Sequence, residues 1–257
     1  MGKFSLPEVT LCAVASVNVA ATVRALQRSA DGVVFARSLL FTDAKISDVG
    51  EIQVVSIPKI RTAAEYSRFV LHDLIHHVST SHCLIVQWDG FVLNPNAWDP
   101  AFLDYDYVGA PWPQFDDGKD VGNGGFSLRS RKLLEACGNE RFRPHHPEDV
   151  AICRTNHALL EDLGMRFAPR SEADRFSFER TTPCQPTFGF HGIFNMIPAL
   201  GADEFWQVYG TLDDRRSAVT DFGLIMRQLG TAHGRWARRF RLGANSVLDR
   251  LRSLLAP

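Results

Sequence analysis

The sequence predicts an α/β fold with a mixed, mainly parallel sheet flanked by helices, followed by a C-terminal helical appendage. Three observations predict it. Over roughly the first 90 residues, short apolar runs typical of buried strands alternate with stretches of helical periodicity. The 257 residues, 45% of them hydrophobic, suffice for a large core. The last 50 or so residues are helix-like and rich in Arg.

The N-terminal part of the chain supplies four strands and two helices. We expect strands at Val9–Ala15, Ser38–Thr42, Ile52–Ile57 and Cys83–Gln87, and helices at Val19–Ser29 and Ala63–His77. Strands that alternate with helices pair in parallel, and such sheets bind ligands at the carboxyl ends of their strands. Ser16, Asp43 and Asp89 follow three of these ends.

The character of the chain changes after Tyr105, where aromatic residues, Gly and Pro become frequent and the loops lengthen. Residues 105–195 hold most of the segments that suggest chemistry. No internal repeat or low-complexity linker precedes Leu200. We therefore expect one core domain over residues 1–200 and an Arg-rich helical appendage over residues 201–257.

Charge and cysteine content limit the class of protein. A net charge of −1 argues against a protein that coats nucleic acid, so no nucleic-acid partner is expected. The five cysteines are scattered without a CxxC pair, which fits neither a disulfide scaffold nor a structural zinc site and indicates buried, reduced thiols. No stretch reaches the ~20 apolar residues of a membrane-spanning helix. The expected compartment is the cytoplasm.

The fourth expected strand ends in Gln87-Trp88-Asp89-Gly90. A carboxylate at the carboxyl end of a strand can meet a hard divalent cation or a sugar hydroxyl. An Asp in a turn also commonly caps its own backbone. Both interpretations of Asp89 stand at this point.

A glycine-rich segment, Gly122-Asn123-Gly124-Gly125, precedes an expected strand edge at Phe126-Ser127-Leu128. Three glycines in four residues permit positive φ angles and a close approach of the backbone to a ligand. The segment matches neither common phosphate-loop pattern, and a tight turn without a ligand explains it as well. Ser130 predicts the start of a further helix.

Two acidic residues, Glu148 and Asp149, precede an apolar helix expected over Val150–Leu163. Acids at a helix N-terminus are favoured by the exposed amides and by the helix dipole. The functional alternative is a carboxylate held rigidly at a cleft as a general base.

A single histidine, His191, lies between glycines and aromatic residues in Phe188-Gly189-Phe190-His191-Gly192. A histidine among aromatic residues is commonly part of a core. Flanking glycines let the imidazole present itself from a tight backbone, and neutral imidazole is a good ligand for a divalent cation.

In this order, the four segments resemble the motifs of the GT-A fold glycosyltransferases, which transfer a sugar from a nucleotide diphosphate. That family has an Asp-x-Asp metal motif, a glycine-rich loop, an x-Glu-Asp motif with the catalytic base, and a C-terminal metal-binding His. Gly-Gly-Phe-Ser and Pro-Glu-Asp-Val are similar to pieces of the inverting β-1,3-transferases of the fringe and core-1 kind. The strings YDYVGAPW, from Tyr105, GNGGFSLRS and FGFHG resemble a bacterial and fungal family of formerly unassigned domains in polysaccharide gene clusters. The resemblance covers roughly residues 8–198.

The resemblance implies a GT-A (Rossmann-like) glycosyltransferase. It would move a sugar from a nucleotide-diphosphate sugar to a hydroxyl of a glycan or lipid-linked glycan, with inversion, in bacterial surface polysaccharide or lipopolysaccharide synthesis. Asp149 would take the acceptor proton, Glu148 would bond sugar hydroxyls, and Asp89 and His191 would bind Mn²⁺ or Mg²⁺. One departure is Gln87, which stands where the metal motif has Asp and supplies no charge, so metal-independent action is the alternative.

The nucleotide sugar is expected across the carboxyl ends of the strands. Its expected contacts are Ser16, Asn18, Asp43, Arg68, Gln87, Gly124 and Gly125. Arg68 could donate to the diphosphate, the alternative being a solvated helix face. Trp112 and Phe126 offer flat faces on which an acceptor sugar could stack, the alternative being a place in the core.

A basic amphipathic helix is expected over residues 235–255. Its charges are six arginines against the single Asp249, and its apolar residues near helical spacing are Trp236, Phe240, Val247, Leu251 and Leu254. Such helices lie in the surface of anionic membranes. This would place the protein peripherally on the inner membrane face, near a lipid-linked acceptor. Packing on the core or on another subunit is the alternative.

Two other function classes stay open. One is a metal-dependent hydrolase that uses Asp89, Glu148, Asp149 and His191. The other is a non-catalytic module that binds a sugar or a nucleotide, for which Gln87 is the sequence support. Metal-dependent turnover of a nucleotide sugar would separate the transferase from both.

Overall fold

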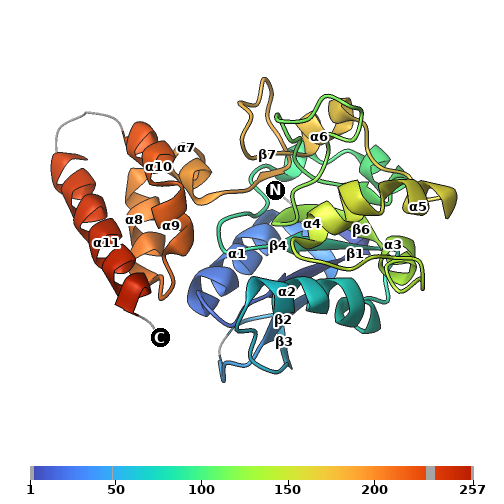
Figure 1. Ribbon diagram of the computed structural model, residues 1–257, viewed down its shortest axis with the longest axis horizontal. Coiled ribbons are helices and arrows are strands. Elements are labelled where there is room, and N and C mark those ends of the chain that lie inside the picture. Colours follow the sequence, from blue (N-terminus) through green and yellow to red (C-terminus); the bar gives the residue numbers. More distant parts are fainter. Residues whose placement is uncertain (1–2, 48, 230–234, 256–257) are drawn as a thin grey trace. The chain divides into compact units, whose positions relative to one another are not determined.

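A computed structural model describes residues 3–47, 49–229 and 235–255, the last helix being described by its backbone alone at residues 235–237 and 250–255. The chain divides into two compact units, Met1–His191 and Gly192–Pro257, of which the second is orange to red in Figure 1. The division falls after His191 and not after residue 200, because α7 (Met196–Leu200) packs against α8 (Ala202–Thr211).

The N-terminal unit is built on one six-stranded sheet with the strand order β3-β2-β1-β4-β6-β5. Its parallel strands are β1 (Phe4–Val14), β2 (Val33–Thr42), β3 (Gln53–Ser56) and β4 (His82–Val86). The strand β6 (Phe126–Ser130) runs antiparallel to both β4 and β5 (Tyr107–Val108). The predicted mixed, mainly parallel sheet is confirmed, whereas Phe126–Leu128 belongs to an inner strand and not to an edge.

The first strands were predictable because helices cover both faces of the sheet. Leu11 and Cys12 are neighbours on β1, yet they belong to two different clusters of the core. Leu11 packs in the cluster that contains Leu26 of α1 (Val19–Gly32), and Cys12 in the cluster that contains Phe69. Strands buried on both faces are continuously apolar, which is the pattern that the sequence shows.

The helix expected over Ala63–His77 is interrupted. It begins as α2 (Ala63–Arg68), where the Thr62 hydroxyl accepts a hydrogen bond from the Glu65 N–H at 3.1 Å. It continues as a π-helical turn (Phe69–Asp73) and a 3₁₀ turn. A π turn inserts one residue without breaking the apolar face, so periodicity does not reveal it.

The helix expected over Val150–Leu163 is interrupted in the same way. It begins earlier, as α4 (Glu148–Val150), passes through a π-helical turn (Ala151–Thr155) and ends as α5 (His157–Asp162). π-Helical turns are frequently found at functional sites. Here the first turn comes shortly after Ser67 and the second shortly after Glu148, and these two side chains are hydrogen-bonded in the candidate site.

Shorter elements complete the N-terminal unit. Ser130 caps α3 (Arg131–Ala136), as predicted, by accepting a hydrogen bond from the Leu133 N–H at 3.0 Å. A further α-helix is α6 (Arg170–Phe176). A small parallel pair joins β7 (Ser177–Phe178) to β8 (Gly189–Phe190) in the register Phe178↔Phe190. This pairing makes the next residues, Glu179 and His191, neighbours.

The C-terminal unit is helical, as expected. Besides α7 and α8 it contains α9 (Arg216–Thr220), α10 (Phe222–Leu229) and α11 (Arg235–Leu255). Phe205, Val208 and Ile225 are buried, whereas Phe240 on α11 is 81% exposed. Within the part of the chain that the structure describes, no helix has the length and apolar character to cross a membrane.

Candidate active site

The carboxyl ends of the parallel strands bring most of the expected nucleotide contacts to one edge of the sheet. The β1–β2 register pairs Val14 with Phe41, so the segments after these strands start side by side. Asn18 is buried at the start of α1 with a φ of 53°. The Ser16 hydroxyl accepts a hydrogen bond from the Ile60 N–H at 2.9 Å, and Asp43 is exposed.

Arg68 lies apart from this group. Its side chain is 72% exposed, and its Nη1 is 3.4 Å from the Asp73 carboxylate, as the solvated-face alternative predicts. The two residues before it on α2 do reach the site. The Tyr66 hydroxyl accepts a hydrogen bond from Gln87 Nε2 at 3.1 Å, and the Ser67 hydroxyl donates to Glu148 Oε2 at 3.2 Å.

His191 is the centre of one half of the site. On one side of the ring, Nε2 lies 3.3 Å from Gln87 Oε1 and 3.5 Å from Asp89 Oδ1. On the other side, Nδ1 lies 3.5 Å from Glu179 Oε1 and 3.2 Å from Asn123 Nδ2. Burial lowers the pKa of His191, but Asp89 and Glu179 outweigh it, and the pKa rises to about 10. Without a metal ion the ring is therefore an imidazolium between two carboxylates.

The donors on the Nε2 side of His191 fit a divalent cation. Asp89 and Gln87 offer oxygen atoms and His191 offers a nitrogen, a set that suits Mg²⁺ or Mn²⁺. No three His, Cys, Asp or Glu side chains cluster as a metal site among the described residues. A cation here would thus have Asp89 and His191 as its ionisable ligands, with positions left for oxygen atoms of a phosphate.

The glycine-rich segment makes room for side chains of the site. A Cβ on Gly125 would lie 2.1 Å from His191 Nε2, and one on Gly124 would lie 2.2 Å from Glu148 Oε1. A Cβ on Gly90 would lie 2.8 Å from His191 Cδ2. The positive φ in this segment belongs to Asn123, at 66°, and to none of its glycines. Glycine is therefore required at positions 124 and 125 by the space that Glu148 and His191 occupy, and not by a positive φ angle.

Glu148 points into the protein. It is 5% exposed, its Oε1 accepts a hydrogen bond from Arg129 Nη2 at 3.1 Å, and its Oε2 accepts one from the Ser67 hydroxyl. Arg129 is fully buried, and its guanidinium also donates from Nε to the Ser127 hydroxyl at 3.0 Å. Both carboxylate oxygens of Glu148 are thus occupied by protein groups.

Asp149 is the more accessible acid of the pair. Its Oδ2 accepts a hydrogen bond from the Gly124 N–H at 2.9 Å, and its Oδ1 accepts one from the Val150 N–H at 2.8 Å. Burial raises the pKa of Asp149, the charge of Glu148 raises it further, and these two outweigh the backbone hydrogen bonds and Arg129. A carboxylate with a raised pKa is a stronger base.

The two aromatic residues expected to stack on an acceptor sugar belong to the core. Phe126 has no exposed surface, and its ring packs against Phe176 and Phe188. Trp112 is 8% exposed, and a Cβ on Gly122 would lie 2.1 Å from its ring. The structure therefore corrects this expectation, because neither ring has a free face.

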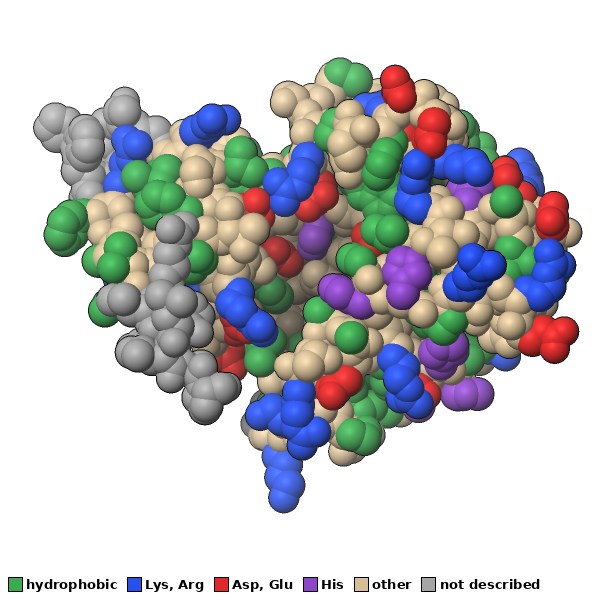
Figure 2. Space-filling view, in the orientation of Figure 1, with side chains coloured by type: hydrophobic (Ala, Val, Ile, Leu, Met, Phe, Trp, Pro, Cys, Tyr) green, Lys and Arg blue, Asp and Glu red, His purple; other side chains and the backbone are tan. Residues whose placement is uncertain are grey.

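Sequence reasoning missed five side chains of the site: Tyr66, Ser67, Asn123, Arg129 and Glu179. Ser67 Oγ also lies 2.9 Å from His146 Nδ1, which joins α2 to the segment before α4. Figure 2 shows several histidine side chains on the face of the N-terminal unit where α2 and α4 lie. Arg129 lies in the string GNGGFSLRS, but only the glycines and Phe126 of that string were expected in the site, and Glu179 lies outside every segment that the sequence singled out.

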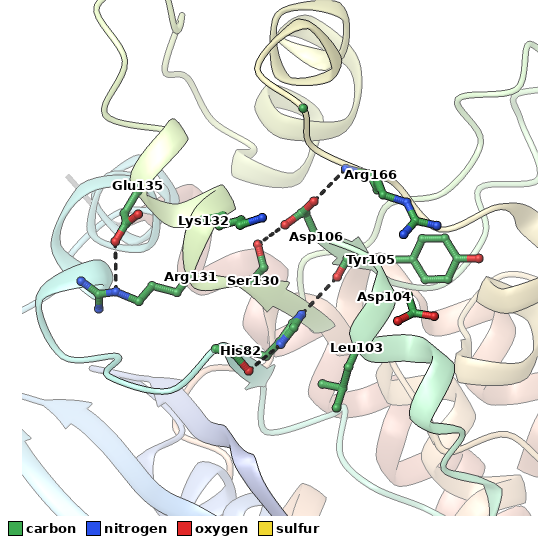
Figure 3. A pocket seen from close by; sticks show the side chains of 12 residues that line it. His82, Leu103, Asp104, Tyr105, Asp106, Ser130, Arg131, Lys132, Glu135 and Arg166 are labelled. Carbon is green, nitrogen blue, oxygen red and sulfur yellow. Dashed lines mark hydrogen bonds and ion pairs between the residues drawn. The ribbon is translucent and has the colours of Figure 1, made fainter.

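A pocket of about 420 Å³ lies at the opposite, amino end of β4 and contains none of the candidate site residues. Figure 3 shows that several of its polar groups bond to one another. Asp106 accepts hydrogen bonds from the Ser130 hydroxyl and the Arg166 N–H, and His82 Nε2 lies 3.2 Å from the Tyr105 carbonyl oxygen. The side chains of Asp106 and His82 are thus satisfied within the pocket.

Comparison with known proteins identifies one protein family and several solved structures of low sequence identity. Residues 51–191, more than half of the chain, match the family described as "Protein of unknown function (DUF5672)". No curated protein matches the sequence.

Three solved structures are similar at low identity. The first is the mannosyltransferase PcManGT from Pyrobaculum calidifontis in complex with GDP-Man and Mn²⁺, with 13% identity and a TM-score of 0.44, covering 93% of this chain and 69% of that chain. The second is a glycosyltransferase involved in the glycosylation of the major capsid of PBCV-1, with 10% identity and a TM-score of 0.45, covering 79% of this chain and 98% of that chain. The third is glucosyl-3-phosphoglycerate synthase from Mycobacterium tuberculosis in complex with Mn²⁺, UDP and glucosyl-3-phosphoglycerate, with 14% identity and a TM-score of 0.38, covering 65% of this chain and 69% of that chain.

Proposed function

The chain belongs to this DUF5672 family, and we propose that it is a GT-A-type glycosyltransferase that moves a sugar from a nucleotide-diphosphate sugar to a hydroxyl of a glycan. One observation carries the proposal. Adjacent residues of one loop hold the two chemical parts of the site, since the Gly124 N–H bonds Asp149 and Gly125 leaves the space for His191. The base and the metal-binding group thus lie close together at the edge of the sheet where such sheets bind ligands.

The donor would lie along the carboxyl ends of β1, β2 and β4, near Ser16, Asn18, Asp43 and Gln87. Gln87 directly follows β4, and Asp89 comes two residues later. When bound by Asp89 and His191, Mn²⁺ or Mg²⁺ supplies positive charge that stabilises the diphosphate as it leaves. Arg68, on the exposed face of α2, would contribute only to the rim of this site.

Asp149 is the proposed general base. Its carboxylate takes the proton of the acceptor hydroxyl while the hydroxyl oxygen bonds to the anomeric carbon and the bond from that carbon to the diphosphate oxygen breaks. The proton stays on Asp149 and the electron pair leaves with the diphosphate. A single displacement of this kind inverts the anomeric configuration. The two backbone N–H groups on Asp149 fix the direction of its carboxylate.

Glu148 would act as an anchor. Its pairing with the buried Arg129 and its hydrogen bond from Ser67 tie the start of α4 to β6 and α2. Truncation to Ala would leave Arg129 without its carboxylate, so the loss of activity would follow a loss of fold. This role replaces the direct contact with sugar hydroxyls that the family resemblance implies.

The acceptor would be a glycan or a lipid-linked glycan of a bacterial surface polysaccharide, approached at the inner membrane face through α11. Phe240, Val247 and Leu248 of this helix are exposed, and Arg241 lies beside Phe240. The side chains of Arg235, Trp236, Arg250, Leu251, Arg252 and Leu254 lie outside the described residues. Co-sedimentation with anionic but not zwitterionic vesicles, lost on Phe240→Ser with Val247→Ser, would support this contact. Equal recovery of both forms would contradict it.

The first experiment is calorimetric titration of UDP, GDP, CDP and CMP, each with and without Mn²⁺. Tight, metal-dependent binding of one nucleoside diphosphate would support the proposal and identify the donor class. Incubation with the matching nucleotide sugar and glycan acceptors would then show transfer. Binding of CMP alone would favour an acidic-sugar donor without a metal.

A non-catalytic binding module is the second candidate, and Gln87 favours it. This side chain is neutral and is already bonded to Tyr66 and close to His191. Tight nucleotide binding without any turnover would support the module. Release of the sugar to water, faster than transfer to every acceptor tried, would indicate a hydrolase.

A further inference from the structure

We propose that Glu179 is a positioning residue for the cation: it accepts the Nδ1–H of His191 and so directs the lone pair of Nε2 toward Asp89 and Gln87. The inference rests on the metal-dependent function proposed above and deepens it. Which nitrogen of an imidazole binds a metal is set by the hydrogen bond that the other nitrogen makes. A carboxylate on that other nitrogen fixes the tautomer and raises the basicity of the ligand.

The geometry around His191 assigns one function to each side of its ring. Glu179 Oε1 lies 3.5 Å from Nδ1. Asp89 Oδ1 and Gln87 Oε1 both lie beside Nε2. Since Glu179 faces the nitrogen opposite to the one that faces Asp89, it does not face the position of a cation on Nε2.

Glu179 is itself held in place. Asn123 Nδ2 donates a hydrogen bond to Glu179 Oε2 at 2.7 Å, while Asn123 Oδ1 accepts one from the Gly125 N–H at 3.2 Å. The second bond fixes which end of the amide faces Glu179. Because one carboxylate oxygen is bound by Asn123, the other is directed to His191. The carboxylate is 15% exposed, so water competes little with these contacts.

The short sheet β7–β8 brings the pair together. The register Phe178↔Phe190 places Glu179 and His191 at the same level, and the His191 N–H donates to the Phe178 carbonyl at 3.0 Å. The pairing of β7 with β8 thus contributes directly to the geometry of the site. It sets the distance between a carboxylate and an imidazole that are twelve positions apart in the chain.

Mn²⁺ binding to the full-length protein tests the inference, with free Mn²⁺ measured by electron paramagnetic resonance. Glu179→Ala should weaken binding about 10- to 100-fold, the usual cost of losing such a partner. Glu179→Gln keeps an oxygen that can accept the Nδ1–H, but its amide nitrogen then faces the Asn123 Nδ2 donor, so it should recover only part of this loss. Glu161→Gln is the matched control, because Glu161 lies 3.1 Å from Nδ1 of His157 outside the site. It should leave the dissociation constant unchanged within about twofold.

The tautomer of His191 supplies a readout that a purely structural role would not move. In long-range ¹H–¹⁵N spectra of the Mg²⁺-loaded protein, the proton should sit on Nδ1 in the wild type and in Glu179→Gln, and should redistribute in Glu179→Ala. An unchanged Mn²⁺ affinity in Glu179→Ala would overturn the inference. So would a loss in Glu179→Gln as large as in Glu179→Ala, since that result would make Glu179 a charged ligand.

Failure of the inference is distinguishable from failure of the proposed function. A wild-type protein that does not bind Mn²⁺ overturns the inference together with the metal site, whatever the transfer assay shows. A wild type that binds Mn²⁺ and transfers sugar, beside a Glu179→Ala variant that binds Mn²⁺ equally well, overturns the role of Glu179 alone.

Discussion

A histidine lies near each end of β4, and the two rings have opposite surroundings. At the amino end, His82 lies between the Ser81 hydroxyl and the Tyr105 carbonyl oxygen. Burial lowers its pKa, more than the Tyr105 carbonyl and Asp106 raise it. Beyond the carboxyl end, His191 lies between Asp89 and Glu179, which raise its pKa to about 10 against the effect of burial.

The difference separates a structural polar cluster from a candidate active site. At the amino end, a hydroxyl group and a backbone N–H satisfy Asp106, which accepts hydrogen bonds at both of its carboxylate oxygens. At the carboxyl end, carboxylates surround a ring whose Nε2 can exchange a proton for a metal ion. A cluster whose charge balance depends on one exchangeable proton is suited to bind a cation. The pocket in Figure 3 has no such feature among the residues that line it.

The largest effect is expected at Asp149. Asp149→Asn keeps the size of the side chain and the acceptor for the Gly124 N–H but cannot take a proton, so transfer should fall about 10²- to 10⁴-fold. Nucleotide binding should stay unchanged. Asp106→Asn, at the other end of β4, is the control and should leave the transfer rate within about twofold. Near-normal turnover of Asp149→Asn would remove Asp149 from the mechanism.

The next effect concerns the buried pair of Arg129 and Glu148. Arg129→Met leaves the Glu148 carboxylate buried without its partner, which should lower the free energy of unfolding by about 3–5 kcal/mol. Arg166→Met is a matched control at the amino end. The guanidinium of each arginine lies 5.3 Å from a tyrosine ring centre, but Arg166 is exposed, so its loss should cost only about 0.5–1 kcal/mol. Urea unfolding of both variants measures the difference, and equal losses would contradict the anchoring role of Glu148.

The parallel strands of the fold were predictable from the sequence, whereas the π-helical turns that interrupt two of its helices were not. Leu11 and Cys12 face different clusters, so the end of β1, Leu11–Val14, is apolar at every position and its sequence pattern is plain. The π-helical turns keep the apolar face of their helices and therefore leave no trace in the periodicity. The strands β7 and β8 are two residues each, too short for any pattern.

The candidate site was predictable only in part. The resemblance picked out Asp89, Asp149 and His191, which the structure brings to one edge of the sheet. Phe126 and Trp112 were placed wrongly because the sequence around an aromatic residue near a motif does not distinguish a ring in the core from a ring at a cleft. Arg129 was missed for the opposite reason, since a charged residue is normally exposed and its burial depends on Glu148, nineteen residues away.

A smaller effect is expected at Gly125. A Cβ there would lie 2.1 Å from His191 Nε2, so Gly125→Ala should displace the ring and weaken Mn²⁺ binding at least about tenfold. Gly210→Ala is the control, because nothing lies within 4 Å of a Cβ at that helical position. It should leave Mn²⁺ binding unchanged and raise the free energy of unfolding by up to about 1 kcal/mol. Wild-type Mn²⁺ affinity in Gly125→Ala would show that His191 does not bind the cation.

The smallest effect is the pH dependence that His82 contributes to stability. The pKa of His82 is lower in the folded protein than its ordinary value of 6.5, so below that pH the unfolded chain binds more protons. The stabilisation is present above pH 6.5 and is lost as the pH falls below it. His77 and His157 have pKa values shifted in the same direction and add to the slope. Above pH 6.5 His191, with a pKa of about 10, contributes the opposite slope in the metal-free protein. Melting temperatures of the metal-free protein between pH 5 and 6.5 should therefore fall on acidification, and less steeply in His82→Gln. An identical slope in that variant would mean that His82 is solvated, and the contrast between the two ends of β4 would then rest on His191 alone.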